Sequence, residues 1–359
     1  MMLNSEGRIQ TAESRASVRG AVRAFTLIEL LVAIAIIAIL AGLLLGVAAR
    51  AAESGREART KSMITRIHTL VMQQYDTYKD RRAPVRDALK GNRSVQQAEF
   101  RLSAMRELML MEMPDRWSDV LLASPDNVSN VSDLIGVEPR YLQPPTAAAS
   151  SFYRGVTPLN EAYRRQYFAM LDAGVSKEAI KANQGAECLY MVVMLATADG
   201  EARSLFNESS IGDTDGDGAY EFLDGWGNPI SWIRWPAGYE SDVQLNARQL
   251  GGDPTTQAWI EAAASDHDPF DLFRVDKAAF RMVPLIFSAG GDERFDLHSA
   301  RETNVWQPVV PPNPSIVPYA PVTSSEGTFF LGSPMTEDGS AVDLNGGADN
   351  ITNHNIAAE

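Results

Sequence analysis

The hydrophobic positions of this chain form one long uninterrupted stretch near its beginning. Between Phe25 and Ala49 the only charged residue is Glu29. At about 1.5 Å per residue, a helix of this length is about long enough to cross a bilayer core of about 30 Å. The pattern predicts a transmembrane helix over residues 25–49, and the carboxylate near its start needs a partner because an isolated charge is costly in an apolar environment.

After the apolar run the pattern becomes amphipathic. Apolar residues recur at helical spacing with basic residues between them: Ile64, Ile67, Val71, Tyr75 and Tyr78. We therefore expect one continuous helix of about 55 residues, whose second half, 50–83, packs against a globular head. Pro84 sets the predicted end, because the residue before a proline disfavours helical backbone angles.

Residues 84–204 have the pattern of a mainly helical insertion. Ser94 to Gln97 has the spacing of a capping box. Thr157-Pro158 places a proline in the first turn of a second helix, which we expect to end near Gly174. A third run, from Glu187 to Thr197, is apolar on all sides and is predicted to be buried.

From residue 205 onwards the pattern changes to short strand-like runs separated by Gly, Asp and Pro. The best strand candidates are residues 230–235 and 280–287. Pro284 predicts that the second strand lies at a sheet edge or bulges there, because proline has no N–H to donate. We therefore expect an α+β fold with a head at residues 205–359.

Composition and charge narrow the function classes. With 359 residues and 45% hydrophobic residues, the chain has enough apolar material for one large domain or two small ones. Cys188 is the single cysteine, so an intramolecular disulfide is excluded and a metal is the obvious candidate to brace the loops. Residues 201–359 hold 25 acidic against 8 basic residues, a net charge of −17. This head disfavours nucleic acid and favours divalent cations or basic partners.

The start of the apolar run resembles the prepilin-type amino terminus of type IV pilins and of the pseudopilins of type II secretion. A basic leader over residues 1–24 is followed by the sequence Phe-Thr-Leu-Ile-Glu-Leu. The resemblance implies cleavage by prepilin peptidase between Ala24 and Phe25, with methylation of the new amino terminus. Family members usually have Gly before the cut; Ala24 is small enough for the same pocket. In this family Glu29 would neutralise the amino group of Phe25 on a neighbouring subunit during assembly.

One acidic stretch of the head has the spacing of a calcium loop of the EF-hand kind. Such a loop needs oxygen ligands at positions 1, 3 and 5, a glycine at position 6, a backbone carbonyl at position 7 and a carboxylate at position 12. Counting from Asp213 gives Asp215, Asp217, Gly218, Ala219 and Asp224, and Glu221 supplies a further carboxylate. Aspartate at position 12 is similar to dockerin-type loops. The sequence predicts a Ca2+ site at these residues, against the alternative of a solvated Asp/Gly turn.

The segment from Asp224 to Pro229 is similar to the Asp-x-Trp-Gly-x-Pro segment of the major pseudopilin of type II secretion. In that family a Ser-x-Gly-x-Asp turn and an Asp-Ile-x-Asn ending follow, and the loop between them binds calcium. Matching positions here are 288–292 and 348–353, so the resemblance implies Asp292 and Asp349 as candidate ligands of a second calcium site.

These features together favour a pilin-like α+β fold: a long N-terminal helix, serving as membrane stem and spine, packed against a small antiparallel sheet, with a large helical insertion. The predicted function is a non-enzymatic pseudopilin, anchored in the inner membrane by one pass with its head periplasmic or extracellular. Its expected partners are pilin-like subunits in a homo- or hetero-polymer, prepilin peptidase and the inner-membrane assembly of the secretion system. The alternatives are a surface type IV pilin for adhesion, motility or DNA uptake, and a membrane-anchored periplasmic enzyme.

Overall fold

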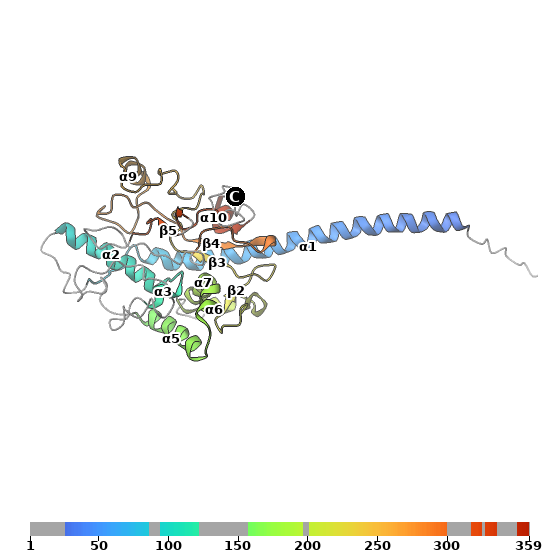
Figure 1. The fold of residues 1–359 in the computed structure, drawn as a ribbon, viewed down its shortest axis with the longest axis horizontal. Coiled ribbons are helices and arrows are strands. Elements are labelled where there is room, and N and C mark those ends of the chain that lie inside the picture. Colours follow the sequence, from blue (N-terminus) through green and yellow to red (C-terminus); the bar gives the residue numbers. More distant parts are fainter. Residues whose placement is uncertain are drawn as a thin grey trace, which may run out of the picture. The chain divides into compact units, whose positions relative to one another are not determined.

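The computed structural model describes residues 26–85, 94–121, 157–196, 201–299, 317–324, 327–335 and 350–358. Within these ranges one long helix precedes several shorter helices and short antiparallel strands (Figure 1). The architecture is α+β with a long apolar N-terminal helix, as in a pilin-like fold. The chain divides into two units, Met1–Glu53 and Ser54–Glu359. The predicted boundaries at residues 83–84 and 204–205 stay predictions.

The first helix, α1, spans Leu27–Thr77 and ends before the predicted limit at Pro84. The amides of residues 78–80 bond to carbonyls three residues earlier, which tightens the last turn and ends the helix. The Tyr78 hydroxyl then donates to Oε2 of Glu112 at 2.8 Å, and Arg81 pairs with the same carboxylate. These contacts hold Tyr78 and Arg81, just after the end of α1, against Glu112.

The second unit contains the helices that follow α1. Their bounds are α2 Ser94–Glu112, α3 Trp117–Leu121, α5 Pro158–Asp172, α6 Lys177–Ala182, α7 Gln184–Ala196, α8 Glu201–Leu205, α9 Gln257–Ala263 and α10 Asn353–Ala358. The predicted start of α5 is confirmed, because Thr157 Oγ1 accepts the Asn160 amide at 3.2 Å and Pro158 is the first helical residue. Its predicted end is confirmed as well, with Gly174 at φ +82° just beyond it.

The strands are short and pair antiparallel throughout the described residues. A three-stranded sheet has the order β3 (Ser231–Ile233), β4 (Leu285–Ser288), β7 (Ile351–Thr352), with Trp232 opposite Ile286. Two-stranded pairs are β1 (Ile211–Gly212) with β2 (Glu221–Phe222) and β5 (Val322–Ser324) with β6 (Gly327–Phe329).

The edge position predicted from Pro284 is wrong, because β4 is the central strand of its sheet. The strand begins one residue after the proline, so no ladder position requires the missing N–H. The carbonyl of Pro284 instead accepts the side-chain amide of Asn353 at 2.9 Å.

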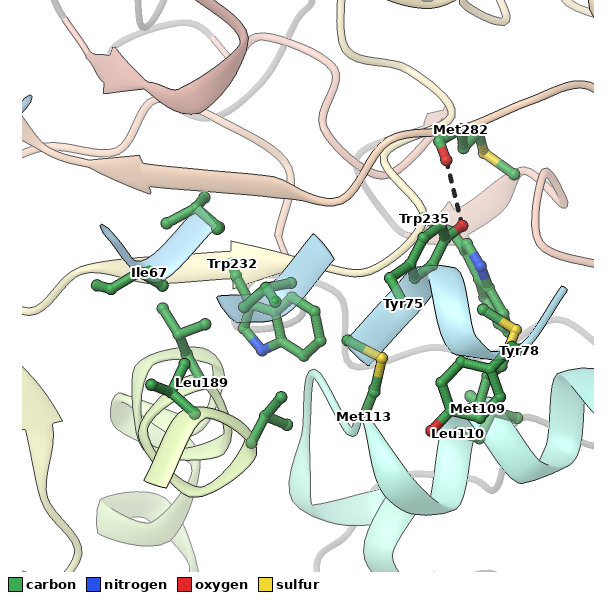
Figure 2. Close-up of a cluster of buried hydrophobic side chains, with 14 of the residues drawn as sticks. Ile67, Tyr75, Tyr78, Met109, Leu110, Met113, Leu189, Trp232, Trp235 and Met282 are labelled. Atoms are coloured by element: carbon green, nitrogen blue, oxygen red, sulfur yellow. Dashed lines mark hydrogen bonds between the residues drawn. The ribbon is translucent and has the colours of Figure 1, made fainter. Parts of the chain in front are cut away.

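The core of the second unit gathers apolar side chains from distant parts of the sequence. Figure 2 shows Ile67 and Tyr75 of α1, Met109 of α2, Leu189 of α7 and Trp232 of β3 converging on one cluster. The Tyr75 hydroxyl donates to the Met282 carbonyl at 3.2 Å, so the polar end of this buried ring is satisfied. Helix α7 packs against β2 and β3, which brings its residues next to the acidic loop (Figure 1).

Candidate functional site

The start of α1 holds the predicted assembly residue Glu29. Its Oε2 accepts the Thr26 amide and the Thr26 hydroxyl, both at 2.9 Å, and the Glu29 amide donates to Thr26 Oγ1 at 3.2 Å. Thr26 and Glu29 therefore form a capping box that closes the first turn. The predicted cleavage residues Ala24 and Phe25 lie outside the described residues.

The apolar part of α1 presents its side chains outward. Every residue from Leu27 to Ala49 is exposed within the chain, including Ile37 at 64% and Leu45 at 72% of their full surface. Among the described residues, α1 is the one helix long and apolar enough to cross a membrane. A continuous apolar surface of this kind must be covered by lipid or by other helices.

The acidic loop joins β1 to β2 as a hairpin. Gly212 is opposite Glu221, so residues 213–220 form the connection. Gly216 and Gly218 have φ values of +77° and +92°, which only glycine adopts at little cost. Asp213 holds the loop together, because its carboxylate accepts the amides of Gly216, Asp217 and Gly218 at 2.7, 3.2 and 3.0 Å.

The structure brings most of the predicted loop ligands together. One carboxylate oxygen from each of Asp213, Asp215 and Glu221 lies within 4.8 Å of the others. Asp217 is buried next to them and accepts the amide of Ala219, which is also buried, at 2.7 Å. The Glu221 carboxylate accepts the Thr214 amide at 3.0 Å.

Asp224, predicted at position 12 of the loop, is directed elsewhere. Its Oδ1 accepts the amides of residues 226, 227 and 228 at 2.8–2.9 Å, and its Oδ2 accepts the Ser288 hydroxyl at 2.6 Å. The hairpin closes at Glu221, position 9 of the count, so the chain has already left the acidic loop when it reaches Asp224. The Asp-x-Trp-Gly-x-Pro segment is therefore folded around its own aspartate.

Glu187 of α7 is a site residue that the sequence did not reveal. One of its oxygens lies within 4.8 Å of oxygens of Asp215 and Asp217, and its side chain is fully buried. Trp117 of α3 donates its indole N–H to Glu187 Oε2. The available signal was one acidic residue at the start of an otherwise apolar helix, where a buried charge requires a partner.

Three buried oxygens of this group have no hydrogen-bond donor among the described residues: Oε1 of Glu187, Oδ2 of Asp217 and Oε1 of Glu221. Burial, reinforced by the neighbouring carboxylates, raises the pKa of Glu187 well above its usual range. Burial likewise raises the pKa of Asp217 to about 6 and that of Glu221 to about 8. The group is costly to keep ionised unless a positive charge is added.

Of the two residues predicted for a second calcium site, the structure describes Asp292. Asp292 is exposed on the short helix η4 (Gly290–Asp292) and accepts the Arg294 amide at 2.9 Å. Asp349 lies outside the described residues. This site stays a prediction.

Comparison with known protein families finds a match, which lies in the amino-terminal region. Residues 19–45 match the family model described as the prokaryotic N-terminal methylation motif. No curated protein and no solved structure matches the chain. The motif and the long apolar helix support a type IV pilin-like protein, and the motif implies processing by prepilin peptidase and assembly into pilin-like polymers.

Proposed function

We propose that this protein is a pseudopilin of a type II secretion system, cleaved before Phe25, anchored in the inner membrane and assembled into a short filament through α1. The observation that carries the proposal is the methylation motif at residues 19–45, continued by an exposed apolar helix surface. A subunit of this kind does its work by polymerising and needs no catalytic residues.

Glu29 is the proposed assembly residue. After cleavage, the chain begins with a charged amine at Phe25, four residues before Glu29. In a bundle of apolar helices, the carboxylate of one subunit and the amine of its neighbour neutralise each other, which removes two uncompensated charges from the apolar environment at once. The capping box with Thr26 keeps the carboxylate satisfied until the neighbour arrives.

The segment from Asp224 to Pro229 favours the secretion branch over a surface pilin. It is similar to the major pseudopilin pattern and contacts two other elements: the Gly225 amide donates to Thr60 of α1, and Asp224 accepts from Ser288 of β4. The alternative is a surface type IV pilin, in which the helices between residues 94 and 196 would offer the binding surface.

The test is deletion of the gene in the source cell, with the secreted proteins and the surface fibres both recorded. The proposal expects loss of secreted proteins with surface fibres retained. Complementation by the wild-type gene should restore secretion. Unchanged secretion together with lost surface fibres would contradict the pseudopilin function and favour the surface pilin.

A further inference from the structure

Some carboxylate oxygens of the acidic loop and α7 accept no hydrogen bond from the described residues. Glu187 and Glu221 are fully buried and Asp217 is 4% exposed, yet each has one oxygen without a donor in the described part of the chain. Buried polar atoms are nearly always paired in folded proteins, so three such oxygens on one hairpin and the helix packed against it point to a ligand that supplies positive charge.

The spacing of the oxygens fits one type of ligand. Calcium binds oxygens at about 2.3–2.6 Å, so two ligands on opposite sides of one ion are about 5 Å apart. Oxygens of Glu187, Asp215 and Asp217 lie within 4.8 Å of one another, and so do those of Asp213, Asp215 and Glu221. All donors are carboxylates, with no imidazole or thiolate in either group, which favours a hard cation over a transition metal.

We propose that Glu187, Asp215 and Asp217 bind a Ca2+ ion, with Asp213 and Glu221 completing its acidic surroundings, and that the ion fastens the β1–β2 hairpin to α7. Asp215 belongs to both oxygen groups and therefore joins them. The ligand set differs from the twelve-residue loop that the sequence predicts, because Glu187 replaces Asp224. This inference does not depend on the filament function.

Neighbouring contacts already hold the loop against the helices. Asn183, between α6 and α7, donates to Thr214 at 3.0 Å and to Asp215 at 3.2 Å. Gln166 of α5 donates to the Gly218 carbonyl at 3.1 Å. Trp117 fixes the Glu187 carboxylate from α3. The ion would therefore bind to a largely preformed group and join the helical part of the head to the hairpin.

The direct test uses the full-length protein in detergent, stripped of metal with EDTA and titrated with Tb3+, a luminescent substitute for Ca2+. Because the Trp117 indole is bonded to a proposed ligand, excitation of tryptophan should sensitise terbium emission. Added Ca2+ should then displace the terbium and abolish the emission. We expect Ca2+ to compete with an apparent Kd below about 1 mM.

Two variants and a matched control assign the ligands. Glu187→Gln keeps the size of the side chain and an oxygen for Trp117 but removes the charge, and should weaken Ca2+ competition at least ten-fold. Asp215→Asn tests an exposed ligand, so the result does not depend on a buried substitution being tolerated. Glu178→Gln makes the same change at an exposed position of α6 and should bind as the wild type does.

Binding of Ca2+ that both ligand variants weaken and the control preserves would support the site. The site is overturned if the wild type shows no Ca2+-competable terbium emission. It is equally overturned if Asp215→Asn, together with any folded Glu187→Gln protein, binds within two-fold of the wild type.

Discussion

The backbone amide of Gly225 donates to the hydroxyl of Thr60 at 2.8 Å, and this bond fixes the Asp-x-Trp-Gly-x-Pro segment to the packed half of α1. The approach is so close that a Cβ added at Gly225 would lie 2.3 Å from the Arg56 carbonyl oxygen. Thr60 is itself fully buried and donates to the Arg56 carbonyl at 3.0 Å. The glycine is therefore required by contact with a helix backbone.

Gly225→Ala should destabilise the head by about 1–3 kcal/mol, because a helix backbone cannot yield to the added methyl group. Denaturant unfolding of the full-length protein in detergent measures this. The matched control is Gly55→Ala in α1, where an added Cβ meets nothing within 4 Å. That change should stabilise the helix by about 0.5–1 kcal/mol. Equal effects of the two substitutions would contradict the proposed close contact.

Asp224→Ala should cost at least about 3 kcal/mol whether or not calcium is present. The reason is that a buried carboxylate with three amide donors and one hydroxyl donor is lost, and hydrogen bonds to charged groups contribute about 1.5–3 kcal/mol each. Unfolding is measured once in EDTA and once with saturating Ca2+.

The control for Asp224 is Asp292→Ala, because Asp292 is exposed and accepts one backbone amide. In EDTA, where no calcium is bound, its loss should change the unfolding free energy by no more than about 0.5 kcal/mol. If Asp224→Ala were destabilising in Ca2+ and neutral in EDTA, Asp224 would be a calcium ligand after all, and the structural role assigned to it would be wrong.

The local signals of the sequence predicted those elements whose ends depend on nearby residues. Thr157 and Pro158 set the start of α5 as expected, since capping is decided within one turn. The place of β4 in its sheet was not predictable in this way. The strand is central because β7, more than 60 residues later, pairs with it, and no local pattern specifies that partner.

The acidic site likewise combines residues that the local sequence indicates with residues that only tertiary contacts bring together. Asp213, Asp215 and Asp217, whose spacing predicts a calcium loop, lie in one hairpin connection, and Asp215 has an oxygen within 4.8 Å of an oxygen of each of the other two. Spacing also suggested Asp224, which lies next to Ser288 of a different strand. Glu187 joins the group because α7 packs against β2 and β3, a tertiary contact that the order of residues along the chain does not encode locally.

Lowering the pH should reduce the folding stability of the head, because His354 is buried in its neutral form. Burial lowers the pKa of His354 from its ordinary 6.5 to about 4, with His68 and Arg281 adding to the effect and backbone bonds to Val283 and Pro284 opposing it. The unfolded chain takes up a proton below pH 6.5 while the folded chain does not until about pH 4. Stability is therefore complete above pH 6.5 and falls between these values by about 1.4 kcal/mol per pH unit.

The measurement compares the pH dependence of unfolding for the wild type and His354→Gln, both in EDTA so that metal binding does not contribute. The variant loses the bonds of the imidazole to Ser241 and Val283 and should be less stable at pH 7.5. Its stability should nevertheless fall less steeply than that of the wild type from pH 6.5 to pH 4.5. Parallel curves would show that His354 does not titrate as described.

Substitutions of Glu29 and Thr26, the two residues of the capping box at the start of α1, should have different effects on filament assembly. Glu29→Gln removes the charge that pairs with the neighbour's amine and should reduce incorporation into filaments at least ten-fold, because an unpaired ammonium in an apolar bundle is strongly unfavourable. Thr26→Ala removes only an N-cap worth about 1 kcal/mol and leaves the Glu29 carboxylate available. The Thr26→Ala variant should assemble to within two-fold of the wild type.

Sedimentation of filaments measures incorporation of each variant, and mass determination of the mature amino terminus confirms that both variants are cleaved. Equal loss in both cleaved variants would mean that Glu29 acts through the first turn of its own helix rather than through a neighbouring subunit.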